Sequence, residues 1–409
     1  MRKILSVILG LCVALQAFPQ SRTDMWDTEK LYKAPEAKEL PAMEKQGVKA
    51  VVIDGIDYKG EKTSFFAYYG LPEGADADHP VPAMVLIHGG GGTAWWTWVK
   101  AWNERGYAAI SMDTTGKIPV PMAGDPFDKG KANRCILPGG IFLEWGGFER
   151  GLRDPSEQWP FCAVSEIVLA HSFLNAVPGV DASRVGVTGN SWGGFLTLLT
   201  AAVDKRFRFA APVYGCGYYN EFPGHAKRSG EAWENWLSLW DPSHYIPEIE
   251  VPVLWIGGTH DFYFDFGALQ KSMALCKTPV YRSTRVEMRH ADGNTIMPEE
   301  TFVMADCYLK GMQALPVVAV PEKGKGRAVS VRFENNGREI VSAEMNYTTD
   351  AENIWKKRAW TTESVPFKKL RRSDGTFVIE AEIPDNAVSV FFNCITSDGL
   401  ISSSSALML

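Results

Sequence analysis

The segment Gly189-Asn190-Ser191-Trp192-Gly193 places a serine between small residues, where a predicted strand gives way to a predicted helix. A nucleophile elbow has this arrangement, because its backbone turns so sharply that only small neighbours can pack around the serine. The pattern Gly-x-Ser-x-Gly is weak evidence alone, but the strand expected over 184–188 gives it the required context. We therefore interpret Ser191 as a candidate nucleophile for acyl transfer.

A serine hydroxyl needs an imidazole to accept its proton and a carboxylate to orient that imidazole. In hydrolases with such an elbow the chain order is serine, acid, histidine. Beyond the elbow, only His290 follows a credible acid at the end of a sheet strand, and it lies just after the strand expected over 281–288. For the acid we favour Asp261, which follows the strand expected over 251–256, and we keep Asp265 as the alternative.

A glycine run, His88-Gly89-Gly90-Gly91-Gly92, follows the strand expected over 83–88. Acyl transfer needs N–H donors aimed at the oxygen that becomes negatively charged, and glycine lets the backbone approach a ligand closely. We expect one donor from the N–H of Trp192 and a second from Gly90 or Gly91. The run lacks the Lys and Ser/Thr of a P-loop, so we do not interpret it as a phosphate cradle.

Tryptophans are dense around these loops, and their flat apolar faces suit sugar rings or apolar acyl groups. We expect contacts with substrate from Trp95, Trp96, Trp145 and Trp236. The alternative is that these side chains fill the core.

The elements that must position these groups alternate between strand and helix, which predicts a mostly parallel sheet in an α/β fold. Strands are expected over 48–53, 64–70, 83–88, 108–113, 184–188, 210–214, 251–256 and 281–288, and helices over 95–105, over 162–176 and from Trp192. The carboxyl ends of parallel strands share one edge, where ligands bind. Two insertions, over 114–161 and 217–246, are long enough to form lids or binding walls.

The last part of the chain has a different pattern, in which strands are expected without helices between them. Segments that alternate apolar and polar residues lie over 328–334, 339–348, 377–383 and 387–395, with turn signals between them. They predict a small C-terminal β-sandwich of the immunoglobulin or fibronectin type III kind. We expect a catalytic domain over 22–316 and the sandwich over 317–409.

The net charge and the amino-terminal segment indicate which classes of protein this chain can belong to. With 42 Lys and Arg against 48 Asp and Glu, the chain is mildly acidic, which excludes a basic surface for nucleic acid. Residues 1–21 have the positive start and short apolar run of a signal peptide, so we expect a periplasmic or secreted protein without a transmembrane segment. The cysteines lack the paired spacing of a zinc site, and we expect no metal and no cofactor.

Four parts of the sequence carry a resemblance to a known group: residues 88–94, 188–194, 211–217 and the strand before Asp261. Over about residues 49–315 the chain resembles exported bacterial α/β-hydrolases, similar to acetyl xylan esterase-like enzymes, dienelactone hydrolase and the prolyl oligopeptidase family. The resemblance implies a doubly wound α/β-hydrolase fold, the same three catalytic side chains, and an acyl ester on a glycan as substrate.

These observations favour a serine carboxylesterase that removes acyl groups, acetyl above all, from a carbohydrate through an acyl-enzyme. One alternative is a serine peptidase of the prolyl oligopeptidase type, although no segment is large enough for the β-propeller that such peptidases usually carry. The other alternative is a non-catalytic glycan-binding protein on a hydrolase scaffold. The expected partner is a small-molecule or glycan ester, and the sequence does not fix the oligomeric state.

Overall fold

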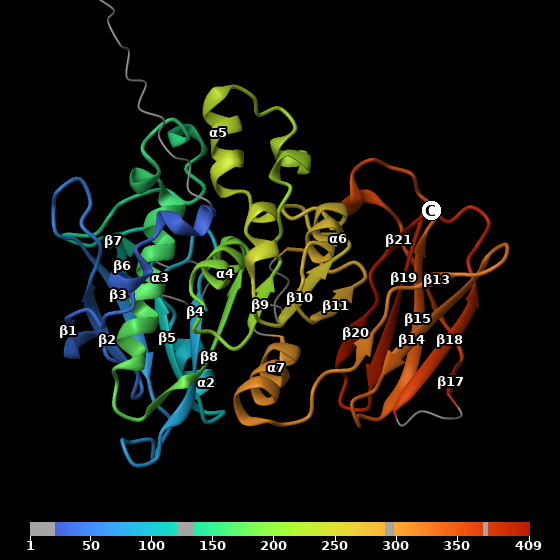
Figure 1. Cartoon of the computed structure of the whole chain (residues 1–409), viewed down its shortest axis with the longest axis horizontal. Helices are drawn as coiled ribbons and strands as arrows, with labels where there is room; N and C mark the ends of the chain where they lie inside the picture. Colours follow the sequence, from blue (N-terminus) through green and yellow to red (C-terminus); the bar gives the residue numbers. More distant parts are fainter. Residues whose placement is uncertain (1–20, 121–133, 291–297, 371–374) are drawn as a thin grey trace, which may run out of the picture.

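A nine-stranded sheet forms the centre of the larger part of the molecule (Figure 1). The computed structural model describes residues 21–120, 134–290, 298–370 and 375–409, so the predicted signal peptide lies outside the described residues except for Ser21. The strand order is β1-β2-β3-β5-β4-β8-β9-β10-β11. The six strands from β5 to β11 in this order run parallel, and β1, β2 and β3 add an antiparallel end. The predicted, mostly parallel sheet is confirmed.

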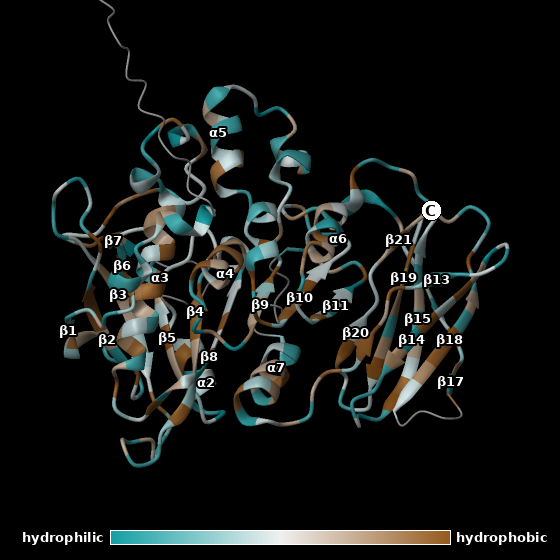
Figure 2. Cartoon of the chain, viewed as in Figure 1, coloured by the Kyte–Doolittle hydropathy of each residue, from teal (hydrophilic) through white to brown (hydrophobic). Residues whose placement is uncertain are grey.

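The strands of the central sheet are β1 (Ala37–Glu39), β2 (Lys49–Asp54), β3 (Ser64–Gly70), β4 (Val81–Ile87), β5 (Ala108–Met112), β8 (Val180–Asn190), β9 (Ala210–Val213), β10 (Val253–Gly258) and β11 (Val280–Arg285). The middle strands are apolar along most of their length (Figure 2). Parallel strands covered on both faces have this composition, because neither face meets water.

The helices are α1 (Thr28–Leu31), α2 (Trp96–Asn103), α3 (Trp159–Asn175), α4 (Trp192–Val203), α5 (Glu231–Trp240), α6 (Phe266–Ala274) and α7 (Glu299–Lys310). Of these, α2, α3, α4, α6 and α7 pack against strands of the central sheet. Helices α3 and α4 pack together against β4 and β8. Helices α2 and α7 meet through Trp102 and Phe302, whose ring centroids lie 4.3 Å apart.

The two insertions pack against each other above the sheet. The first contains the hairpin of β6 (Lys117–Pro119) and β7 (Arg134–Ile136), and the second contains α5, at the top of Figure 1. Trp236 of α5 donates its indole N–H to the carbonyl oxygen of Gly146 at 2.7 Å. The ring of Phe148 lies 4.6 Å from that of Trp236. The insertions therefore form one joint wall.

The C-terminal part is a sandwich of two antiparallel sheets (Figure 1). Its strands are β12 (Val317–Val318), β13 (Glu322–Lys323), β14 (Ala328–Glu334), β15 (Ile340–Thr348), β16 (Thr361–Ser364), β17 (Phe367–Lys369), β18 (Thr376–Glu382), β19 (Ser389–Thr396), β20 (Ile401–Ser403) and β21 (Leu407–Met408). Val331, Phe333 and Ile379 of one sheet share a core with Met345 and Phe392 of the other. A common core between two sheets is what defines a sandwich.

Buried polar contacts join the sandwich to the part that contains the large sheet, where β20 packs alongside β11. The carboxylate of Glu300 on α7 is only 1% exposed and lies 2.8 Å from the guanidinium of Arg285. It also accepts a hydrogen bond from the backbone N–H of Ile401 at 3.1 Å. The N–H of Thr284 donates to Oγ of Ser403 at 2.8 Å. Burying a charge without such partners would be costly, so these contacts fix the junction.

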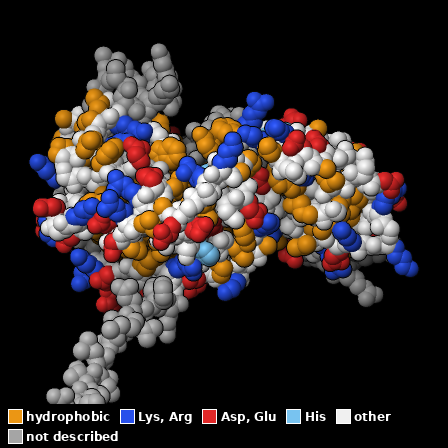
Figure 3. All heavy atoms as spheres, turned by 90° about the horizontal axis from the view of Figure 1, so that it is seen from above, with side chains coloured by type: hydrophobic (Ala, Val, Ile, Leu, Met, Phe, Trp, Pro, Cys, Tyr) orange, Lys and Arg blue, Asp and Glu red, His pale blue; other side chains and the backbone are white. Residues whose placement is uncertain are grey.

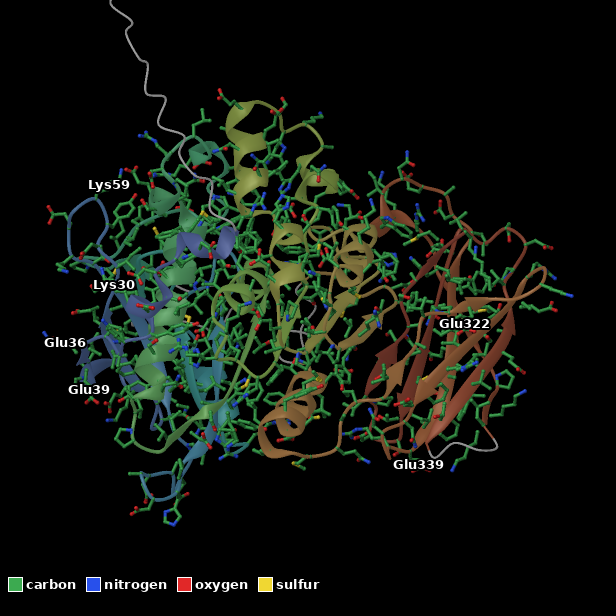
Figure 4. All side chains as sticks on the ribbon, viewed as in Figure 1. Lys30, Glu36, Glu39, Lys59, Glu322 and Glu339 are labelled. Carbon is green, nitrogen blue, oxygen red and sulfur yellow. The ribbon has the colours of Figure 1, made fainter. Side chains whose placement is uncertain are left out.

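Charged side chains lie along the outer edges and over the surface of the molecule. Glu36 and Glu39 lie at the outer edge of the central sheet, and Glu322 and Glu339 lie on the sandwich (Figure 4). Glu39 pairs with Lys49 at 2.8 Å on the exposed edge strand, where charges discourage pairing with another chain. Seen from above, acidic and basic side chains are interspersed over the surface (Figure 3). In the part of the chain that the structure describes, no helix has the length and apolar character needed to cross a bilayer.

Candidate active site

Strand β8 turns into α4 at Ser191, whose backbone adopts φ 58° and ψ −122°. A residue other than glycine seldom takes a positive φ, so the surrounding structure must hold it there. A Cβ on Gly193 would lie 2.2 Å from the carbonyl oxygen of Ile87, and one on Gly194 would lie 2.6 Å from that of Val213. The glycines are therefore required by close backbone contacts, as the elbow interpretation expects.

His290 lies between Ser191 and Asp261. Its Nε2 is 2.8 Å from Oγ of Ser191, and its Nδ1 is 2.9 Å from Oδ2 of Asp261. Because a carboxylate only accepts, Nδ1 carries the proton and Nε2 faces the hydroxyl with its lone pair. The side chains of His290 and Asp261 are 8% and 2% exposed. The structure thus brings together the three residues that were predicted from chain order and from the strands that precede them.

The two candidate acids have different surroundings. Oδ1 of Asp261 accepts hydrogen bonds from the backbone N–H groups of Tyr263 at 2.7 Å and Phe264 at 2.9 Å, which leaves Oδ2 facing His290. Asp265 is the N-cap of α6, and its Oδ1 accepts from the N–H of Gly267 at 2.9 Å. Burial raises the pKa of Asp265 to about 6. Its role is to cap a helix, so the alternative acid is set aside.

The loop that carries His290 begins earlier than predicted. Strand β11 ends at Arg285 rather than at 288, because Glu287 adopts φ 58° and turns the chain out of the sheet. The ring of Tyr214, at the end of β9, packs 4.7 Å from the imidazole of His290. The imidazole is therefore placed by a turn and by aromatic packing, not by the end of a strand.

The glycine run lies against the elbow. A Cβ on Gly89 would lie 3.1 Å from the Cβ of Ser191, and one on Gly90 would lie 2.7 Å from Cδ1 of Trp192. Gly91 has φ 75° and lies toward Arg134. Trp192 is the first residue of α4, where backbone N–H groups have no acceptor inside the helix. Of the two predicted glycines, Gly90 is thus the one that contacts the elbow.

Two side chains that sequence reasoning missed support this run. Nε2 of His88 accepts the backbone N–H of Thr114 at 3.1 Å, so its Nδ1–H donates to the carbonyl oxygen of Gly89 at 2.8 Å. Burial lowers the pKa of His88, which keeps the imidazole neutral. Arg134 donates to the carbonyl oxygen of Gly92. The place of His88 beside the glycines was a usable signal, whereas no sequence signal indicated Arg134.

A pocket of about 210 Å³ opens beside these groups. Its lining residues are Trp145, Phe148, Trp192, Tyr219, Phe222, Gly224, His225, Arg228, Phe262, Tyr263 and Phe264. The rings of Phe262, Tyr263 and Phe264 lie 5.5, 5.1 and 5.7 Å from that of His290. On the other side, the indole of Trp145 lies 3.2 Å from where a Cβ on Gly90 would be. Residues of the pocket wall therefore contact both the imidazole and the glycine run.

Only one of the four predicted substrate-binding tryptophans lines this pocket. Trp145 is 36% exposed and forms part of its wall. The prediction for Trp236 is wrong, because this side chain is fully buried and its N–H is used within the wall. Trp96 is only 8% exposed, and the ring of Trp95 stacks on that of Trp98 with their centroids 5.8 Å apart. Neither Trp95 nor Trp96 lines the pocket.

Most of the aromatic lining was missed by sequence reasoning. Phe262, Tyr263 and Phe264 follow Asp261 directly, and their adjacency to a predicted acid could have revealed them. Phe148 and Tyr219 come from the insertions, where no periodic pattern showed which side chains turn toward the nucleophile.

Residues 16–232 match the family described as acetyl xylan esterase (AXE1), just over half of the chain. The matched region contains Ser191 and the glycine run and ends before Asp261 and His290.

Solved structures with a similar fold include two acetyl xylan esterases. The enzyme from Paenibacillus sp. R4 is 21% identical with a TM-score of 0.54, over 70% of this chain and 94% of that chain. Acetyl xylan esterase 1 from Thermoanaerobacterium sp. JW/SL YS485 is 16% identical with a TM-score of 0.53, over 69% and 94% of the respective chains. At this level of identity, the likeness shows the fold.

Curated relatives include peptidases. The probable dipeptidyl-peptidase 5 of Aspergillus clavatus is 24% identical over 208 residues, which are 47% of this chain and 25% of the relative. Dipeptidyl-peptidase 5 of Porphyromonas gingivalis is 26% identical over 218 residues, 47% of this chain and 27% of the relative. The chain therefore spans about a quarter of the length of these relatives.

Proposed function

The chain belongs to the acetyl xylan esterase (AXE1) family, and on this premise we propose that it is a serine carboxylesterase that removes acetyl groups from a carbohydrate. The observation that carries the proposal is the position of His290, 2.8 Å from the hydroxyl of Ser191 and 2.9 Å from the carboxylate of Asp261. A hydroxyl, an imidazole and a carboxylate in this order form an activated nucleophile.

The proposed reaction proceeds through an acetyl-enzyme. Oγ of Ser191 attacks the ester carbonyl carbon while Nε2 of His290 takes the hydroxyl proton, and Asp261 stabilises the imidazolium. The backbone N–H groups of Trp192 and Gly90 donate to the carbonyl oxygen as it becomes negative. His290 then gives the proton to the departing sugar oxygen. Water, activated by the same imidazole, attacks the acetyl-enzyme and releases acetate and free Ser191.

The test is hydrolysis of 4-nitrophenyl acetate and of an acetylated xylo-oligosaccharide by the purified chain. Ser191→Ala should lose this activity and labelling by a fluorophosphonate. Ser183→Ala is the matched control, because the exposed hydroxyl of Ser183 donates to Asp181 on the surface, away from the nucleophile. A wild-type protein that neither turns over these esters nor reacts with the fluorophosphonate would contradict the proposal.

A peptidase is the second candidate, favoured by the dipeptidyl-peptidase names of the curated relatives. The same three side chains can cleave amides. Faster cleavage of Ala- or Pro-4-nitroanilides than of acetyl esters would support the peptidase and reject the esterase.

We also propose that residues 1–21 act as a signal peptide, so that the enzyme works in the periplasm or outside the cell. The support is the sequence itself, with Arg2 and Lys3 before a short apolar run. Amino-terminal sequencing of the protein recovered from cell fractions tests this, and an uncleaved cytoplasmic chain would reject it.

A further inference from the structure

The pocket beside Ser191 combines aromatic walls with one formally charged side chain, Arg228, among its described lining residues. The guanidinium carbon of Arg228 lies 4.3 Å from the ring centroid of Phe148 and 5.8 Å from that of Trp233. Such cation–π contacts hold the charge at the wall. Burial lowers the pKa of His225, so this neighbour adds no charge at neutral pH.

Arg228 is available to a ligand. Within the part of the chain that the structure describes, its guanidinium has no carboxylate partner and no hydrogen-bond acceptor. Lys271 of α6 differs, since its Nζ lies 2.7 and 2.9 Å from the two carboxylate oxygens of Glu221. A guanidinium presents paired N–H donors that match the two oxygens of a carboxylate.

A second cation, on the sandwich, lies near one ring of the pocket wall. Nζ of Lys356 lies 5.8 Å from the ring centroid of Phe262, which is part of the pocket wall. Across the described residues Lys356, like Arg228, has no ion-pair partner. The chain as a whole carries more acids than bases, so the position of these two cations at rings of the pocket wall does not follow from composition.

The place of the pocket indicates which half of an ester enters it. Phe262, Tyr263 and Phe264 all contact the imidazole of His290, which would return its proton to the departing alcohol. The alcohol half of the substrate therefore lies on this side. The volume of about 210 Å³ is below the roughly 300–1,000 Å³ of pockets that enclose drug-sized molecules, so it suits a single ring.

From these contacts we propose that the enzyme selects acetylated glycans that carry a carboxylate, such as a uronic acid, with the sugar ring against the aromatic wall and its carboxylate on Arg228. Lys356 adds a longer-range attraction. The inference rests on the proposed esterase function and specifies the substrate class of the same site.

The test compares two acetylated methyl glycosides, a glucuronoside and the xyloside that lacks only its carboxylate. The wild type should show a kcat/KM about tenfold or more higher for the glucuronoside, since hydrogen bonds to charged groups reach this size. Arg228→Gln should lower the ratio of the two values about tenfold, and Lys356→Gln should lower it less. Lys271→Gln is the matched control and should leave the ratio unchanged.

The outcomes separate this inference from the function on which it rests. Equal hydrolysis of both glycosides, or an Arg228→Gln ratio that matches wild type, would overturn the uronate preference and leave the esterase intact. If neither ester is cleaved, binding of the unesterified glycosides to Ser191→Ala still tests the pocket, and tighter binding of the glucuronoside supports it. A preference for 4-nitrophenyl hemisuccinate over 4-nitrophenyl acetate that Arg228→Gln removes would place the carboxylate on the acyl half and overturn the proposal.

Discussion

Trp355 of the sandwich lies against Gly267 of α6, so closely that a Cβ on Gly267 would be 2.6 Å from the indole Nε1. Its ring also lies 5.1 Å from that of Phe266, and Phe266 lies 5.4 Å from Trp360. Helix α6 starts directly after the loop that holds Asp261. The sandwich therefore braces the segment that carries the acid.

Trp355→Ala should remove this brace. We expect a loss of about 1 to 2 kcal/mol in the free energy of unfolding and a fall of kcat/KM for 4-nitrophenyl acetate, because the loop before α6 loses packing. Urea denaturation and steady-state kinetics measure the two effects. Gly267→Ala, which would push Trp355 away, should act in the same direction. Unchanged kinetics in both variants would show that the sandwich does not position this loop.

Asp261→Asn and Asp265→Asn separate the two candidate acids. Asp261→Asn should lower kcat about 10⁴-fold, because an amide can hold His290 in the wrong tautomer. Asp265→Asn should keep kcat within a few-fold of wild type, since asparagine still caps α6. Comparable losses in both variants would contradict the assignment.

The raised pKa of Asp265 predicts how stability depends on pH. A carboxyl with a pKa of about 6 in the folded state and about 4 in the unfolded chain binds its proton more tightly when folded. Its contribution therefore favours folding below pH 4 and weakens as the pH rises to 6. Asp265→Asn should be more stable than wild type at pH 7 by at most about 3 kcal/mol. Urea titrations at pH 4 and pH 7 test this, and a difference that is independent of pH would refute it.

Two glycines near the nucleophile should respond differently to alanine. Gly193→Ala would place a Cβ 2.2 Å from the backbone of Ile87, so we expect about 3 kcal/mol or more of destabilisation. In Gly90→Ala the new Cβ meets the side chain of Trp192, so kcat should fall about tenfold or more while stability changes little. Gly224→Ala, where nothing lies within 4 Å, is the control for stability in thermal unfolding. A Gly193→Ala protein as stable as wild type would contradict this account of the elbow.

Substitutions of two tryptophans in the insertions should have different effects on stability and on substrate binding. Trp236→Phe loses a buried hydrogen bond, which should cost about 1 to 3 kcal/mol of stability. Trp145→Ala alters an exposed pocket wall, so KM for a glycan ester should rise while the melting temperature stays nearly constant. Calorimetry and kinetics on both variants provide the check. A melting temperature that falls more in Trp145→Ala than in Trp236→Phe would reverse the assignment.

The parts of this fold that depend on local sequence patterns could be predicted from the sequence. The strand before Ser191 and the order of Ser191, Asp261 and His290 follow from an elbow that needs glycines and from a common sheet edge. Helix α7 had usable signals too, since it follows Pro298 and ends at Gly311 in a left-handed conformation, but no helix was assigned there.

The pocket was less predictable, because it depends on contacts between distant segments. Trp236 and Trp145 are both tryptophans in insertions, and only the packing of α5 against the first insertion buries one and leaves the other exposed. The approach of Lys356 to Phe262 likewise depends on how the sandwich packs against the rest of the molecule.

The contact between β20 and β11 also protects the edge of the large sheet from pairing with another copy of the chain. Side chains of Ser403 and Asn393 occupy the backbone N–H and C=O of Thr284, on the last strand of the large sheet. Without the sandwich, these groups would be open to strand addition by another copy. A chain that ends at residue 316 would keep Ser191, Asp261 and His290, but the edge of β11 would be exposed and the chain would be prone to aggregation.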